Sequence, residues 1–112
     1  QLLQLALCNI LINASKYSND QPVNVALGAD EQHIIIVVKD TGIGIPESEL
    51  QYIYDPYFRA SNAQSYEGYG IGLPLARNII KIHNGKLHVK SVKDIGTTVR
   101  IDLPIADNPY EE

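Results

Sequence analysis

Five consecutive β-branched residues, Ile34 to Val38, are the feature that most limits how this chain folds. Valine and isoleucine favour extended, pleated backbone, and an uninterrupted apolar run is typical of a strand covered on both faces or lying deep in a sheet. The run ends at Asp40, and glycines follow at positions 42 and 44. The sequence therefore predicts a sheet built around residues 33–40, with a carboxylate and a turn at one end of this strand.

The flanking segments predict the other elements of a two-layer fold. Apolar residues recur with helical periodicity in two segments, and Pro74 fixes the start of the second near Ile71 or Gly72, because proline is tolerated only in the first turn of a helix. Pro46, followed by acidic residues, predicts a short helix. We expect an α/β (α+β) two-layer sandwich, in which a mixed, mostly antiparallel sheet carries about three helices on one face. The helices are expected at residues 2–17, 46–53 and 71–83, and the strands at 23–27, 33–40, 86–92 and 97–104.

Length and composition limit the function classes. The 112 residues suffice for one domain with one core, and 45% apolar with 20% charged residues is typical of a soluble globular protein. The net charge of −4 gives no electrostatic reason to expect nucleic acid or an acidic membrane as a partner. The single cysteine, Cys8, is interpreted as a small buried side chain in a reducing compartment. The sequence contains neither a signal peptide nor an apolar run of about 18 residues.

The domain organisation is read from the ends of the chain and from one polar loop. Gln1 leads directly into apolar helical residues without a capping residue, so we interpret residues 1–112 as a single domain, truncated at its N-terminus, of a longer protein. Residues 59–70 carry many small and polar side chains without apolar periodicity, which predicts a mobile lid. Residues 105–112 are expected to be an acidic tail.

The first helix carries an unusual polar stripe. At about 100° per residue, Asn9, Asn13 and Lys16 lie within roughly 60° of one another on an otherwise apolar helix, with Tyr17 at the edge of the stripe. One interpretation is the solvent side of an amphipathic helix, although such a side is normally wide and rich in Glu, Lys and Gln. The other is a ligand site, since amide groups and an ammonium are suitable partners for metal ions and phosphate oxygens.

Two glycine-containing segments offer further candidates. The Asp40-x-Gly42 sequence is compatible with ordinary turn chemistry, but a carboxylate at the mouth of an apolar strand is also a suitable acceptor for the exocyclic amine of a purine. Gly68, Gly70 and Gly72 run directly into a helix N-terminus, which favours anion binding. Their spacing matches neither the Rossmann fingerprint nor the P-loop.

Taken together, these segments resemble the ATP-binding catalytic domain of sensor histidine kinases, which has the Bergerat fold and belongs to the superfamily of the gyrase, Hsp90 and MutL ATPases. The resemblance extends from Leu2 to Pro104 and implies ATP and Mg²⁺ as cofactors. The matching segments are NILINASKYS (N box), DTGIGI (G1 box), YDPYFR (F box), GYGIGL (G2 box) and GTT (G3 element). The F box departs from the usual Phe-x-x-Phe-Tyr, because here it reads Tyr54-Asp-Pro-Tyr57-Phe58.

The resemblance also implies roles for individual residues. Asp40 would accept the adenine amino group, and Asn9 and Asn13 would lie at Mg²⁺ and the phosphates. Lys16 would contact phosphate oxygens, and Tyr17 the ribose or phosphate edge. Several further positions of the family pattern are carried over to this chain. They are Gly42, Gly44, Ile45, Leu73 and Thr98 at the base, and Arg59, Gly68, Gly70, Ile71 and Gly72 at the phosphates and the lid.

The first helix separates the subclasses of this superfamily. Relatives that hydrolyse ATP place a glutamate on this helix, whereas no carboxylate occurs between Leu2 and Ser18 here, and water without a base is a poor nucleophile. We therefore expect phosphoryl transfer to a histidine on a separate helical-hairpin domain. His33 and His88 are interpreted as strand surface residues and His83 as a helix C-terminal residue.

The expected partners and the alternatives follow from that reading. The expected partners are the phosphoacceptor hairpin of the same parent protein, which would also make the parent a homodimer, and a downstream response regulator. The expected location is the cytoplasm, for a parent that is free or membrane-anchored. An anti-sigma-type serine kinase and a non-catalytic, nucleotide-gated interaction module remain open, while a dimeric ATPase clamp is disfavoured by the missing glutamate.

Overall fold

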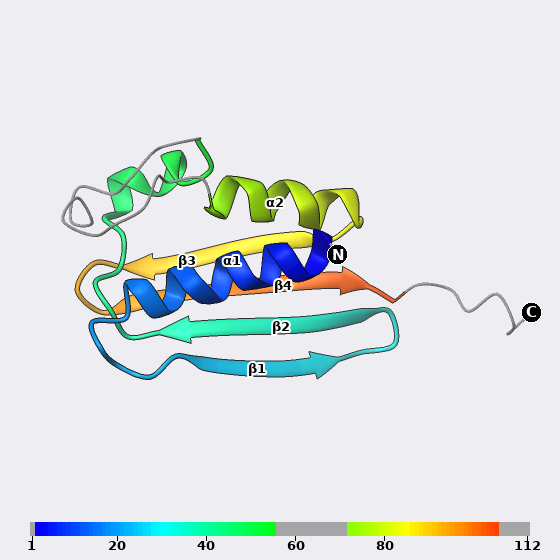
Figure 1. Cartoon of the computed structure of the whole chain (residues 1–112), viewed down its shortest axis with the longest axis horizontal. Coiled ribbons are helices and arrows are strands. Elements are labelled where there is room, and N and C mark those ends of the chain that lie inside the picture. Colours follow the sequence, from blue (N-terminus) through cyan, green and yellow to red (C-terminus); the bar gives the residue numbers. More distant parts are fainter. Residues whose placement is uncertain (1, 56–71, 106–112) are drawn as a thin grey trace, which may run out of the picture.

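The computed structural model describes residues 2–55 and 72–105, and these form two layers (Figure 1). Among these residues the sheet has four strands in the order β1-β2-β4-β3, and every pairing is antiparallel. The predicted α+β sandwich is confirmed, and the described part of the sheet contains no parallel pair. The elements are α1 (Leu2–Lys16), β1 (Asn24–Ala29), β2 (His33–Asp40), the 3₁₀ helix η1 (Glu47–Tyr52), α2 (Gly72–Ile82), β3 (Lys86–Val92) and β4 (Gly96–Pro104).

Both α-helices cover the same face of the sheet and run in opposite directions (Figure 1). Ala6 of α1 and Ala76 of α2 are completely buried, and such small side chains let neighbouring elements pack closely at these positions. The core is completed by large buried side chains from both helices and from β2 and β4, against which Leu87 and Val89 of β3 pack half-buried. Its buried members are Ala6, Ile10, Ala14, Val38, Ala76, Ile79, Ile80, Val99, Ile101 and Leu103.

The predicted third helix is only a six-residue 3₁₀ helix, η1. Pro46 precedes it with an extended backbone, at φ −56° and ψ 137°, rather than inside its first turn. None of the residues of η1 is buried, although Ile53, directly after it, is. With so few apolar contacts to stabilise further turns, a short run of tighter helix is the expected outcome.

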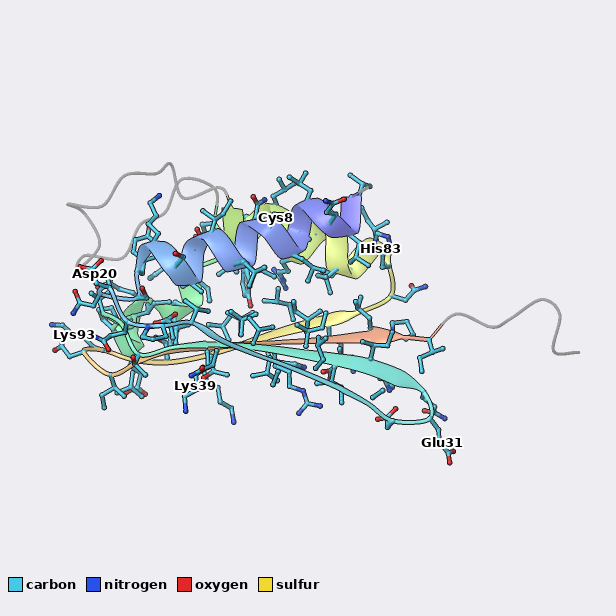
Figure 2. The ribbon with its side chains drawn as sticks, turned by 60° about the horizontal axis from the view of Figure 1, so that its bottom comes forward. Cys8, Asp20, Glu31, Lys39, His83 and Lys93 are labelled. Carbon is cyan, nitrogen blue, oxygen red and sulfur yellow. The ribbon has the colours of Figure 1, made fainter. Side chains whose placement is uncertain are left out.

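The expectation that Cys8 is buried is wrong. Its side chain is exposed, and Figure 2 shows it on the side of α1 that is turned away from the sheet. Helical geometry explains this, because Cys8 lies about 160° around the axis from Ile10, which is in the core. Ile12, on the same outer side, is 60% exposed. The side of α1 that faces solvent is therefore largely apolar.

Within the described residues, α1 and α2 cover one face of the sheet, as the expected sandwich requires, and no helix covers the other, so β2 is not a strand covered on both faces. Lys39 is exposed and points away from the helices (Figure 2). On this outer face, Val37 pairs with Arg100 and Ile35 with Asp102, and both apolar side chains are half-buried. β2 lies between β1 and β4, so its central position is confirmed.

The three histidines lie where the sequence places them. His33 and His88 are strand residues, half-buried and exposed respectively. His83 directly follows α2, where its Nδ1 lies 2.8 Å from the carbonyl oxygen of Ile79. Within the described ranges no helix is long and apolar enough to cross a membrane.

Candidate functional site

The loop of residues 41–46 follows β2 and is hydrogen-bonded to two segments that are far from it in sequence. The Ile43 amide donates to the carbonyl oxygen of Tyr17 at 3.1 Å, which ties the loop to the end of α1. The Asp94 amide donates to the carbonyl oxygen of Ile43 at 2.7 Å, which ties it to the β3–β4 turn. Figure 2 shows Asp20, just beyond α1, and Lys93, in the β3–β4 turn, at this same end of the molecule. This end contains the candidate site.

Asp40 is a buried acceptor at the base of the loop. It is 6% exposed, and its Oδ1 accepts the Gly42 amide at 2.9 Å. Burial raises the pKa of Asp40, while hydrogen bonds from the backbone of Gly42 and Thr97 act in the opposite direction. A buried carboxylate is costly unless its oxygens are hydrogen-bonded, so this position is built to hold an acceptor.

Gly42 and Gly44 allow the loop backbone to pack tightly against its neighbours. A Cβ atom at position 42 would lie 1.7 Å from the carbonyl oxygen of Tyr17, and one at position 44 would lie 2.0 Å from that of Val92. Gly44 also has φ +65°, which side-chain-bearing residues rarely adopt. Both glycines are required by the protein backbone itself, whatever ligand the loop contacts.

The polar stripe of α1 ends beside this loop. Asn9, Asn13 and Lys16 are half-buried, as is Tyr17, which directly follows the helix. The Lys16 ammonium lies 5.6 Å from the centre of the Tyr17 ring, within cation–π range. Because the most exposed side of α1 is apolar, the stripe does not occupy the place of an ordinary solvent face. The structure therefore favours the interpretation of the stripe as a ligand site.

The register of β4 brings Thr97, rather than Thr98, to the Asp40 side of the sheet. Thr97 pairs with Asp40, whereas Thr98 pairs with Lys39 on the outer face. The family resemblance implies Thr98 at the base pocket, but the structure places this residue on the opposite face of the sheet from Asp40. Alternation along the strand could have identified Thr97, since directly paired residues share a face.

The remaining predicted residues are placed only in part. Ile45 is half-buried in the loop, and Gly72 and Leu73 open α2. Tyr54, from the F box, stacks on Arg77 of α2, with 4.4 Å from the guanidinium carbon to the ring centre. Burial raises the pKa of Tyr54, against the effect of the Arg77 charge. The predicted lid and most of the tail lie outside the described residues, as do Tyr57, Phe58, Arg59, Gly68, Gly70 and Ile71.

Comparison with known families decides the identity of this arrangement. Residues 1–107 match the HATPase_c family, described as histidine kinase-, DNA gyrase B- and HSP90-like ATPases. The chain belongs to this family. The match covers every element of the described fold.

Within the HATPase_c family, the similar proteins are sensor kinases. The chain is 38% identical over 107 residues to the adaptive-response sensory kinase SasA of Rippkaea orientalis, covering 94% of this chain and 27% of that protein. It is 31% identical over 109 residues to the sensor histidine kinase WalK of Bacillus subtilis, covering 93% of this chain and 18% of that protein. The solved structure of the mycobacterial sensor histidine kinase MprB superposes with a TM-score of 0.78 at 34% identity, over 89% of this chain and 70% of that one. The chain is thus homologous to the ATPase domains of sensor histidine kinases, and it spans about a quarter or less of the length of these two full relatives.

Proposed function

We propose that this domain binds Mg·ATP and supplies the γ-phosphoryl group to a histidine on a separate helical-hairpin domain of its parent protein. The observation that carries the proposal is that the loop after the buried carboxylate of Asp40 is hydrogen-bonded to Tyr17 at the end of α1, a helix whose amide stripe has no carboxylate of its own. Bound Mg·ATP would supply the reactive phosphoryl group and neutralise charge on its oxygens. The residues of this chain bind, orient and enclose it.

The base side of the proposed site is built around Asp40. This carboxylate accepts the amino group of adenine, and its burial keeps water from competing for the same oxygen. Ile45 and Leu73 supply apolar contact to the flat faces of the ring, and Gly42 and Gly44 shape the loop beneath it. We assign the threonine of this pocket to Thr97, because its backbone amide donates to Asp40.

The phosphate side of the proposed site is the stripe of α1. The amide oxygens of Asn9 and Asn13 suit Mg²⁺, which is usually held by few protein ligands together with phosphate oxygens. In the described part of the chain no group of three or more His, Cys, Asp or Glu side chains is placed to hold a metal ion. Lys16 donates to phosphate oxygens, and Tyr17 borders the ribose. Arg59 and the residues Gly68, Gly70, Ile71 and Gly72 are assigned to the phosphates when the lid closes.

The same stripe disfavours hydrolysis. α1 has no carboxylate to take a proton from water, so a water molecule near the γ-phosphate is not activated by this helix. The phosphoryl group is thereby preserved for an imidazole acceptor. The greater length of the sensor-kinase relatives is compatible with an acceptor hairpin in the same polypeptide. We also propose that the parent is a homodimer that signals to a response regulator from the cytoplasmic side.

The test is phosphorylation of the parent protein with ATP labelled on the γ-phosphate. We expect labelled protein in which the phosphate is labile to acid and stable to base, as for phosphohistidine. Acid-stable phosphate would instead support a serine kinase, and nucleotide binding without labelling would support a nucleotide-gated interaction module. The isolated domain should bind Mg·ATP in calorimetry and release almost no phosphate, whereas rapid phosphate release would contradict the role given to α1.

A further inference from the structure

Ser91, at the end of β3, makes contacts that link three parts of the proposed base pocket. Its Oγ accepts the backbone amide of Ile45 at 2.8 Å, across 46 positions of sequence. The same oxygen lies 2.7 Å from the Oγ1 of Thr97 and donates to the carbonyl oxygen of Gly96 at 3.1 Å. Ser91 lies outside the five sequence segments that carry the family resemblance.

The protons of this network can be assigned from the capacity of a hydroxyl group. A serine hydroxyl has one hydrogen to donate and two lone pairs to accept. With its hydrogen directed at the carbonyl oxygen of Gly96, Ser91 accepts from the Ile45 amide and from the Thr97 hydroxyl. This arrangement uses all the hydrogen-bonding capacity of the group. Loss of the hydroxyl would therefore affect three partners at once.

The network lies in one row with Asp40. Across the sheet Asp40 on β2 pairs with Thr97 on β4, and Thr97 pairs with Ser91 on β3, so the three side chains share the face that carries the helices. Ile45, from the loop, adds to the far end of this row through its bond to Ser91. Hydrogen bonds thus run from Asp40 through Thr97 and Ser91 to Ile45, the loop residue assigned to the base.

We propose that Ser91 is a positioning residue for adenine recognition. Its hydroxyl group holds the Ile45 segment and the Thr97 side chain at a fixed distance from each other. The proposal rests on the assignment of the base pocket to Asp40 and the loop after it. Ser91 contacts no nucleotide in this scheme. It acts by keeping the apolar wall at Ile45 in register with the carboxylate, so that a purine can fill the space between them.

The backbone contacts of the loop explain why a side chain is needed at this point. The loop is held at Ile43 by hydrogen bonds to Tyr17 and Asp94, both through backbone groups. These bonds lie two residues before Ile45, whereas the Ile45 amide itself donates to the Ser91 side chain. An alanine at position 91 would leave a part-buried amide without this acceptor, which favours a shift of the loop towards water.

The first experiment measures the loop without nucleotide. Amide hydrogen exchange, followed by NMR, would compare Ser91→Ala with the wild type, and the Ile45 amide is expected to exchange roughly three- to tenfold faster, as for the loss of one hydrogen bond. Lys90→Ala is the matched control, because Lys90 is the preceding residue of β3 and is exposed. Ser91→Thr keeps the hydroxyl and should restore slow exchange. Unchanged exchange at Ile45 in Ser91→Ala would overturn the proposal.

The second experiment measures base discrimination, which a purely structural role would not alter. Calorimetry would give the affinities for ATP and for inosine triphosphate, in which a carbonyl oxygen replaces the amino group. Because the Ile45 wall would contact the ring of either base, Ser91→Ala should weaken both nucleotides, but it should weaken ATP roughly three- to tenfold more than inosine triphosphate. Thr97→Val, which loses the second hydroxyl of the network at constant shape, should act in the same direction. Equal losses for both nucleotides, in both variants, would reduce Ser91 to a structural residue.

The two experiments separate this inference from the proposed function. If the wild-type domain bound neither nucleotide, the proposed function would fail, and the exchange of the Ile45 amide would still decide whether Ser91 holds the loop. If the wild type bound ATP and Ser91→Ala behaved like the wild type in both measurements, the proposed function would stand and the role of Ser91 would be refuted.

Discussion

Replacement of Asp40 by asparagine is the most direct test of the base pocket. The change keeps the size of the side chain and one acceptor oxygen, but it removes the negative charge and substitutes an NH₂ donor for the other oxygen. In the wild type the carboxylate is 6% exposed, so a hydrogen bond from an adenine amine is little weakened by water. A hydrogen bond to a charged group is worth about 1.5–3 kcal/mol, which corresponds to an increase in Kd of about 10- to 150-fold.

The assay is calorimetric titration with ATP and with inosine triphosphate. The wild type should prefer ATP, and Asp40→Asn should lose or reverse this preference, because the new NH₂ group can donate to the carbonyl oxygen of inosine. Asp102→Asn is the matched control, since Asp102 pairs with Arg100 on the outer face of the sheet at 2.8 Å. The control should change affinity by no more than about twofold. If Asp40→Asn bound both nucleotides as the wild type does, Asp40 would not be part of the base site.

Asp40→Asn also tests the pKa of Asp40, through the pH dependence of the unfolding free energy. Burial raises the pKa of Asp40 above its ordinary value of 3.8, so the folded state binds a proton more tightly than the unfolded state. The corresponding stabilisation is present below pH 3.8 and is lost as the pH rises through the raised pKa. Between about pH 4 and pH 7, the unfolding free energy of Asp40→Asn should therefore fall less than that of the wild type. An identical pH dependence in urea denaturation would contradict this reasoning.

Three further substitutions test the phosphate side, the loop and the core. Asn13→Ala should weaken Mg·ATP more than adenosine in calorimetry, and equal losses would place Asn13 away from the phosphates. Gly44 has φ +65°, and a Cβ added there would lie 2.0 Å from the carbonyl oxygen of Val92, so Gly44→Ala should lower the unfolding free energy by about 1–3 kcal/mol or more. A Cβ added at Gly28 would have nothing within 4 Å, so Gly28→Ala should change it by less than about 1 kcal/mol. Ile80→Ala, at a completely buried position, should cost about 2–5 kcal/mol in urea denaturation. Ile82→Ala, at a position 68% exposed, should cost less than about 0.5 kcal/mol, and equal costs for the two isoleucines would refute the burial pattern of α2.

The sequence predicted the order and type of the elements because each carries its own periodicity and its own punctuation. Pro74, in the first turn of α2, and Gly85, shortly after its last turn, mark the two ends of that helix, and the run at residues 34–38 identifies the central strand. The family resemblance was confirmed by the match over residues 1–107. The expected placement of the helices on one face of the sheet was also met by α1 and α2. The β-branched run alone did not show this, because such a run is equally compatible with one or two helical layers.

The exposure of Cys8 and the position of Thr98 on the outer face of the sheet both differ from what the sequence suggests, and the two differences have a common physical origin. Cys8 and Thr98 each lie next to a residue that does face the core or the site, and a shift of one position moves a side chain by 100° in a helix and by 180° in a strand. The angular position of the buried side of α1 depends on α2 and the sheet, and these are not visible in fifteen residues of helix. In β4 the decisive information was the pairing with Asp40, which is a long-range property of the fold.

The glycines of the loop after Asp40 change how mutations in this family motif should be interpreted. Gly42 faces the backbone of Tyr17 and Gly44 faces that of Val92, so a side chain at either position would push the loop away from α1 or from the β3–β4 turn. Such a variant would lose nucleotide affinity because the pocket is distorted, even if no ligand atom touched the glycine. Loss of binding at these positions therefore does not identify a ligand contact. Replacement of Asp40 by asparagine, which alters a hydrogen-bonding group at nearly constant size, separates recognition from architecture more directly.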